Sequence, residues 1–157
     1  MTAYDRLIRQ AVRAKLDEWR RLRAWQGACD HTAAVLAPPS VRHVGVCRAS
    51  RVEIMLRPGQ HLADALATIL HEYAHVASLG GHGPAWARVF AEAVREVTGV
   101  QIVAQATRPV IDAQATDAVS AWLAAGCPTP VGCPKIGQPD TDGGIGAGAD
   151  AATARKR

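Results

Sequence analysis

The sequence predicts a small α+β domain in which one helix is followed by a small β-sheet and then by further helices. Apolar residues recur at three- and four-residue steps near the N-terminus and again beyond residue 60, which is the period of helices with one buried face. Between these segments, residues 41–59 hold short valine-rich runs around a polar turn, a pattern typical of paired strands. The length of 157 residues and the hydrophobic content of 48% suit one domain with a modest core and a tail.

An amphipathic helix is predicted from residue 3 to about residue 25. Its apolar positions recur at helical steps: Tyr4, Leu7, Ile8, Ala11, Val12, Leu16, Trp19 and Leu22. Seven cationic residues from Arg6 to Arg23 cover the remaining surface. This surface is either a solvated helix face or a site for nucleic acid, and we favour the solvated face.

Two short strands are expected next, as an antiparallel pair. Their apolar positions are Val41, Val44 and Val46, then Val52, Ile54 and Leu56, on either side of the polar turn at residues 48–50. Three helices follow, at residues 61–79, from Pro84 to just before Gly99, and at residues 110–125. From Gly126 onward Pro, Gly, Ala and Asp dominate, so residues 126–157 are expected to form a flexible tail after a domain that spans residues 1–125.

The charge and the cysteine content limit the partners and the cellular compartment that we expect. The net charge of +4 permits contact with nucleic acid through a basic surface without requiring it. The N-terminus lacks the apolar stretch of a signal peptide, and no run approaches the roughly 18 apolar residues of a membrane span. We therefore expect a cytoplasmic protein without membrane contact, whose cysteines are free thiols: Cys29, Cys47, Cys127 and Cys133. None of them forms the C-x-x-C pair of a zinc ribbon.

The segment HEYAHVASLGGHG, residues 71–83, carries the chemistry of the chain. On a helix, His71 and His75 lie one turn apart on the same face, close enough to share a metal ion. Glu72 lies about 100° round the helix from His71, where it can reach a bound water without being a ligand. The apolar stripe through Ile69, Tyr73 and Val76 is expected on the opposite side, packed in the core.

His82 is the candidate third ligand. On a continuous helix it would lie near 10 Å from His75, too far for the same ion. We expect the pair Gly80-Gly81 to stop the helix and to turn the chain back. Three neutral imidazoles with an open fourth position are typical of a catalytic zinc site, in which Glu72 acts as the general base for peptide-bond hydrolysis.

Alternatives remain open at this point. His71 and His75 could be surface residues beside a solvated acid, or a distant carboxylate could replace His82 as the third ligand. A zinc-site protein without catalysis, which binds nucleic acid or a protein partner, is the competing function, and Glu72 argues against it because metal binding alone does not need that acid.

The segment TILHEYAHVASLGGHGPAWARVF, residues 68–90, resembles the SprT-like family of zinc metallopeptidases, a branch of the zincins. That family carries a His-Glu-x-x-His helix and then His-Gly-x-x-aromatic at the start of the next helix, matched here by His71, Glu72 and His75 and by residues 82–86. The similarity covers roughly residues 1–99. It implies a minimal zincin-like domain in which His71, His75 and His82 bind Zn²⁺ and Glu72 is the catalytic base. Some relatives cleave proteins attached to DNA, which makes DNA-associated proteins an implied substrate class.

Other polar residues are weaker candidates. Zincins often stabilise the oxyanion with a Tyr, His or Arg. Tyr73 is expected in the core instead, and Arg42 and His43 are expected as plain surface residues. Cys47 is expected in a buried apolar role, and His31 and His61 as capping or loop residues.

Overall fold

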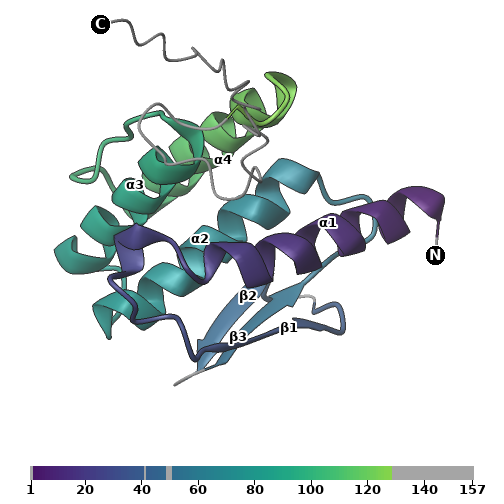
Figure 1. Cartoon of the computed structure of the whole chain (residues 1–157), viewed down its shortest axis with the longest axis horizontal. Coiled ribbons are helices and arrows are strands. Elements are labelled where there is room, and N and C mark those ends of the chain that lie inside the picture. The colour runs from purple at the N-terminus through teal and green to yellow at the C-terminus, as the bar shows by residue number, and fades with distance from the viewer. Residues whose placement is uncertain (1, 41, 49–50, 129–157) are drawn as a thin grey trace, which may run out of the picture.

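The computed structural model describes residues 2–40, 42–48 and 51–128 and has the α+β architecture that the sequence predicts. The elements, in chain order, are α1 (Ala3–Trp19), the short 3₁₀-helix η1 (Arg23–Trp25), β1 (Ala33–Ala37), β2 (Gly45–Arg48), β3 (Arg51–Met55), α2 (Leu62–Ser78), α3 (Pro84–Thr98) and α4 (Arg108–Ala124). The three strands form one sheet along one side of the molecule, and α3 and α4 lie on the far side of α2 from it (Figure 1).

The sheet has the strand order β1-β3-β2. The predicted antiparallel pair is confirmed as β2 and β3, with Gly45 opposite Ile54 and Cys47 opposite Val52. The sequence analysis missed β1, which pairs in parallel with β3. Its sequence, AAVLA, contains three alanines, which are weak strand formers, and its pairing partner lies 18 positions away in the chain. Because β3 lies in the middle, β1 and β2 are the two edge strands of this sheet, among the described residues.

Helix α2 lies at the centre of the molecule and contacts α1, α3, α4 and the strands β2 and β3. The predicted apolar stripe is confirmed, since Ile69 and Tyr73 are fully buried. The Tyr73 hydroxyl donates to the Leu16 carbonyl oxygen at 2.6 Å, so this tyrosine belongs to the core, as expected. The opposite side of α2 is also largely covered: His71 and Glu72 are only 8% and 6% exposed, because α4 and β2 pack there.

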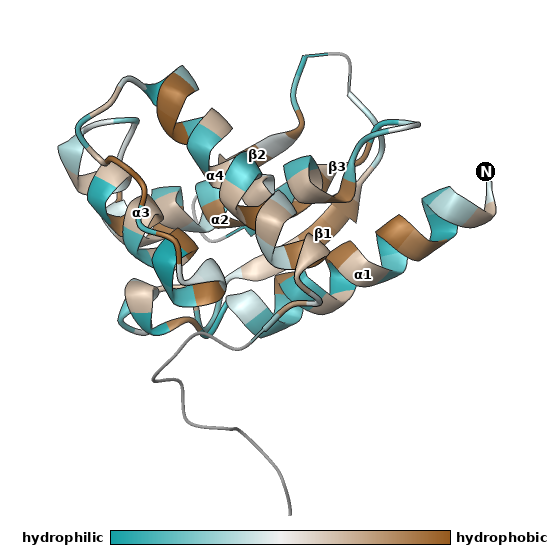
Figure 2. Cartoon of the chain, turned by 90° about the horizontal axis from the view of Figure 1, so that it is seen from above, coloured by the Kyte–Doolittle hydropathy of each residue, from teal (hydrophilic) through white to brown (hydrophobic). Residues whose placement is uncertain are grey.

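Helix α1 ends at Trp19, earlier than the predicted limit near residue 25. The chain turns there and places η1 so that Trp25 packs against Tyr73, with ring centroids 6.0 Å apart. The Trp25 indole N–H also donates to the Trp19 carbonyl oxygen at 2.7 Å. The first turns of α1 project beyond the rest of the chain, and Tyr4 and Leu7 are exposed there (Figure 2).

The remaining boundaries follow the sequence closely. Pro84 opens α3, Gly99 ends it with a φ of 75°, and α4 begins at Arg108, two residues before the predicted start. The predicted tail comprises residues 126–157. Its residues after 128, Cys133 among them, lie outside the described residues. Cys29, Cys47 and Cys127 are free thiols. Within the described ranges, none of the helices has the length and apolar character needed to cross a membrane.

The Glu96 carboxylate ties the N-terminal segment to α3. Its two oxygens accept hydrogen bonds from the backbone N–H groups of Arg23 and Ala24 at 2.9 and 2.8 Å. The Glu96 side chain is only 13% exposed, so these charge-assisted bonds are partly shielded from water. They hold η1, and with it Trp25, against the rest of the core.

We therefore expect Glu96→Ala to lower the free energy of unfolding by about 1–2 kcal/mol, because two backbone donors lose a charged acceptor. Urea unfolding followed by circular dichroism measures this change. Glu92→Ala is the matched control, since Glu92 on the same helix pairs only with Arg95 at an exposed site and should change the free energy by less than about 0.5 kcal/mol. Equal effects of the two substitutions would contradict this role of Glu96.

Candidate metal centre

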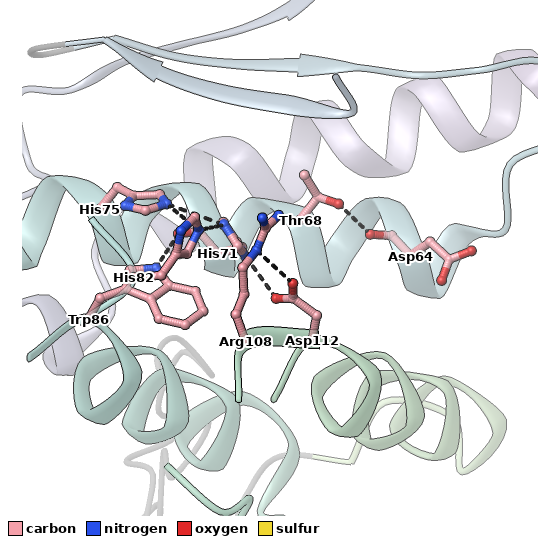
Figure 3. Close-up of polar contacts among 8 residues, drawn as sticks. All are labelled: Asp64, Thr68, His71, His75, His82, Trp86, Arg108 and Asp112. Carbon is pink, nitrogen blue, oxygen red and sulfur yellow. Dashed lines mark hydrogen bonds and ion pairs between the residues drawn. The ribbon is translucent and has the colours of Figure 1, made fainter. Parts of the chain in front are cut away.

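Three histidine side chains converge at the C-terminal end of α2. The Nε2 atoms lie 3.2 Å apart for His71 and His75, 3.1 Å for His75 and His82, and 3.0 Å for His82 and His71 (Figure 3). His71 and His75 come from successive turns of α2, and His82 comes from the segment between α2 and α3. The structure thus brings together the three ligands that the sequence predicts, and the group can hold a metal ion.

The size of this triangle fits a metal ion. Imidazole nitrogens lie about 2.0–2.1 Å from a bound zinc ion. For nitrogens that are 3.0–3.2 Å apart, a point at that distance from all three lies about 1 Å above their plane. An ion there is left with one open side, so the three residues fit a tetrahedral site with an open fourth position.

Hydrogen bonds fix the tautomers of two of these rings. His75 Nδ1 lies 2.8 Å from the Gly80 carbonyl oxygen, which can only accept, so Nδ1 carries a proton. His71 Nδ1 lies 2.8 Å from the carboxylate oxygen Oδ1 of Asp112 and donates to it. In the neutral rings, both Nε2 atoms therefore direct lone pairs into the triangle at 3.2 Å from each other. Such a contact is repulsive unless a cation lies between the nitrogens.

Protonation of the imidazole rings does not readily supply a positive charge between these nitrogens. Burial lowers the pKa of His75 and outweighs the hydrogen bond to the Gly80 carbonyl, which raises it, while His71 and the cation Arg108 lower it further. Burial, followed by the charges of Arg108 and the other two histidines, lowers the pKa of His82 to about 4. These two rings are neutral near pH 7, which is the form that binds metals.

The turn that brings His82 back differs from the predicted one. The residue in the left-handed conformation is Leu79, with φ 54° and ψ 32°, and neither Gly80 nor Gly81 has a positive φ. The backbone N–H of Gly83 then donates to the Gly81 carbonyl oxygen at 2.8 Å and tightens the return. The left-handed conformation costs a residue with a Cβ roughly 1–2 kcal/mol.

Glu72 lines the same cleft as the three histidines and is held in a close-packed position. Burial raises its pKa, against the lowering effects of His71, of Arg108 and of a hydrogen bond from the Cys47 backbone N–H. A Cβ added at Gly45 would lie 2.6 Å from the Glu72 oxygen Oε1 and 2.6 Å from Thr68 Cγ2. Only glycine thus lets β2 approach the acid this closely.

Trp86, from the first turn of α3, forms one wall of the site. Its ring centroid lies 4.8, 5.7 and 4.7 Å from those of His71, His75 and His82. Its indole N–H donates to the His71 carbonyl oxygen at 3.3 Å, and Phe90 packs behind it. This buried indole limits the orientations of all three imidazoles.

Asp112 and Arg108, both on α4, were missed by the sequence analysis. Arg108 Nε lies 3.3 Å from Asp112 Oδ2, while Oδ1 of the same carboxylate accepts from His71 (Figure 3). Burial raises the pKa of Asp112, but the hydrogen bond and charge of His71 and the charge of Arg108 outweigh it and lower the pKa overall. The Arg-x-x-x-Asp spacing indicates a helical pair, but no local pattern shows that it meets a histidine 41 positions earlier.

A cleft runs along α2 through the site. It consists of two adjoining hollows of about 610 and 550 Å³, which share His43, Gly45, His71, Glu72 and Arg108 in their walls. The first also contains His75, Val76, Leu79 and His82, and the second extends to Asp64 near the start of α2. Arg42 and His43 are exposed, as expected, and lie at the rim of this cleft, which the half-buried Cys47 also lines. His31 is exposed, and His61 precedes α2 without a side-chain cap.

The open edge of β2 borders the cleft. Met55 N–H donates to the Val44 carbonyl oxygen at 2.9 Å, so in this antiparallel ladder residues 44, 46 and 48 direct their backbone groups to β3. Gly45 and Cys47 direct theirs to the other side, toward Glu72. Backbone donors and acceptors therefore face the site beside the acid.

Comparisons of the chain with protein-family models, with curated proteins and with solved structures found no match.

Asp112→Ala should weaken the binding of a divalent transition metal by about 10- to 100-fold, because the carboxylate that fixes the tautomer and the orientation of the His71 ring is lost. Titration with Co²⁺, followed by its visible absorption and by competition with a chelator, measures the affinity. Asp117→Ala, an exposed position on the same helix, is the control and should leave the affinity unchanged. Unaltered affinity in the Asp112 variant would show that the His71–Asp112 contact does not support the site.

Proposed function

We propose that the protein is a zinc-dependent peptidase that uses Glu72 as its general base. The observation that carries this proposal is the meeting of three Nε2 atoms within 3.2 Å of each other, two of them held as lone-pair donors by Asp112 and Gly80. Three neutral imidazoles with an open fourth position form the ligand set of catalytic zinc. The SprT-like motif in the sequence agrees with the same assignment.

Zinc, when bound by His71, His75 and His82, lowers the pKa of a coordinated water and polarises a carbonyl oxygen. The chain's own part begins with Glu72. Its carboxylate takes a proton from the water as the oxygen adds to the scissile carbonyl carbon, and it then delivers that proton to the leaving nitrogen. The C–N bond breaks, and a carboxylic acid and an amine are formed, which leave as a carboxylate and an ammonium group once the acid's proton passes to the amine.

The surroundings of Glu72 suit this exchange of protons. Burial raises its pKa from the ordinary value, which makes the carboxylate a stronger base than a solvated glutamate. The Cys47 N–H and the close contact with Gly45 hold the side chain at the wall of the cleft. A purely structural metal site gains nothing from a buried acid at this place, because burying a carboxylate is unfavourable.

The cleft accommodates a peptide in the extended conformation. The open edge of β2 presents the backbone groups of Gly45 and the Cys47 carbonyl, with which a substrate strand can pair. Along α2 the cleft runs from Asp64 to Leu79, which corresponds to about 22 Å at 1.5 Å per residue. An extended chain of six or seven residues covers about this length.

The purified wild-type protein is expected to bind one equivalent of zinc, and His75→Ala is expected to lose it, because two imidazoles alone hold the ion weakly. Metal analysis after dialysis against a chelator-free buffer measures the content. His31→Ala replaces an exposed histidine outside the site and should retain the full equivalent. Wild-type protein that takes up no zinc on addition would remove the basis of the proposed function.

Glu72→Gln should keep the zinc and lower the rate of peptide hydrolysis by 10²- to 10⁴-fold, because the amide cannot accept the proton of the water. Cleavage of unfolded casein, read on gels and by mass spectrometry alongside the zinc content, tests this. If Glu72→Gln cleaves as fast as the wild type, the acid is not the base. If neither cleaves while both hold zinc, the protein is a non-catalytic zinc module.

A further inference from the structure

Leu79 combines two unfavourable features beside the candidate metal centre. Its side chain is 92% exposed, although it is a large aliphatic group. Its backbone also has the left-handed conformation, with a φ of 54°, which residues with a Cβ avoid. The residue lies directly at the end of α2, between His75 and the returning His82.

The fold needs the turn at this position but does not need a leucine. The turn lets the Gly80 carbonyl accept from His75 Nδ1 and returns the chain so that His82 meets the other two rings. Glycine or asparagine adopts the left-handed conformation more readily than leucine and would make the same turn. Because the exposed side chain also buries almost no surface in the described chain, folding does not account for its identity.

The position of Leu79 in the cleft suggests a reason for a leucine at this place. Leu79 lines the first hollow together with Val46 from β2 and Val76 from α2. It follows His75 by four residues, which places its backbone about 6 Å further along the helix axis than the metal ligand. This distance is about that of two residues in an extended peptide.

The two ends of the cleft differ in chemistry. The walls of the second hollow, on the other side of His71 and Glu72, are largely polar and include Arg42, Arg57, Gln60 and Asp64. The aliphatic side chains Val76 and Leu79 line the first hollow alone, whereas Val44, Pro58, Ala67 and Phe90 line the second. The second hollow carries more charged groups, so a bound peptide would meet fewer charges on the Leu79 side of the reacting bond.

We propose that Leu79, with Val76, forms a subsite that binds an apolar side chain of an extended peptide, within two residues of the scissile bond. This inference rests on the proposed peptidase function and adds the substrate class to it. Binding of the substrate side chain removes the exposed leucine from water, which favours the complex.

The test compares the zinc-loaded wild-type chain with Leu79→Asn on paired fluorogenic peptides. The members of each pair differ only by Leu or Ser at one position within two residues of the cleaved bond. The wild type should prefer the Leu peptide at one such position, and Leu79→Asn should reduce this ratio of kcat/KM about tenfold, as expected for one apolar contact. Val103→Asn, a 54% exposed valine outside the cleft, should leave the ratio unchanged.

Two further measurements distinguish an effect of Leu79→Asn on the subsite from effects on folding and on catalysis. The Tm of Leu79→Asn should equal or exceed that of the wild type, since asparagine tolerates the left-handed conformation; a clear fall would show that the leucine supports the fold. In the Glu72→Gln background, fluorescence anisotropy should show that Leu79→Asn weakens binding of the Leu peptide about tenfold.

The outcomes separate the two proposals. An unchanged Leu/Ser ratio in an active Leu79→Asn enzyme overturns the subsite and leaves the peptidase function standing. Binding of the Leu peptide through Leu79 without cleavage by the wild type supports the subsite and overturns the peptidase function. Neither binding nor cleavage of any peptide of the set overturns both.

Discussion

Three imidazole nitrogens lie 3.0–3.2 Å apart, a spacing that suits one shared metal ion, and the packing of the rest of the chain holds them at that distance. Two of the rings have their outer nitrogens occupied, one by the Asp112 carboxylate and one by the Gly80 carbonyl. The lone pairs of those rings must then point inward. The repulsion stored in this arrangement is relieved when a metal ion binds, so α2, α4 and the turn after α2 together preorganise the site.

The same packing explains why the acid beside the histidines is buried. Helix α2 is enclosed by β2 on one side and by α3 and α4 on the others, so His71 and Glu72 lie inside the molecule although they are polar. Each finds a specific partner there: Asp112 for His71 and the Cys47 N–H for Glu72. Buried polar groups persist when they are satisfied in this way, and their rigidity favours one geometry of the site.

The sequence predicted those parts of the site that depend on local periodicity. His71, Glu72 and His75 follow from the helical repeat, and His82 follows from a helix that must end before it. The antiparallel pair β2 and β3 and the core position of Tyr73 were predicted for the same reason. Asp112 and strand β1 could not be predicted, because each is defined by a partner far away in the chain.

The turn after α2 shows why a correct prediction can rest on the wrong residue. The sequence places two glycines there, and glycine is the usual residue for a left-handed helix end. The chain instead turns at Leu79, one residue earlier, because the Gly80 carbonyl must lie where His75 Nδ1 can donate to it. Neither glycine is then required by space or by a left-handed backbone, since a Cβ at Gly81 would meet no atom within 4 Å and neither residue has a positive φ.

Helix α4 extends the functional unit beyond the part of the chain that carries the motif. The resemblance to SprT-like proteins ends near residue 99, yet the carboxylate that orients His71 lies at residue 112 and its partner cation at residue 108. A fragment that ended after α3 would lose both groups and also the apolar side chains of α4, among them Ile111, Val119 and Trp122, so the faces of α2 and α3 that they cover would be exposed. Loss of α4 therefore acts on the site twice, through the orientation of one imidazole and through the packing of the helix that carries it.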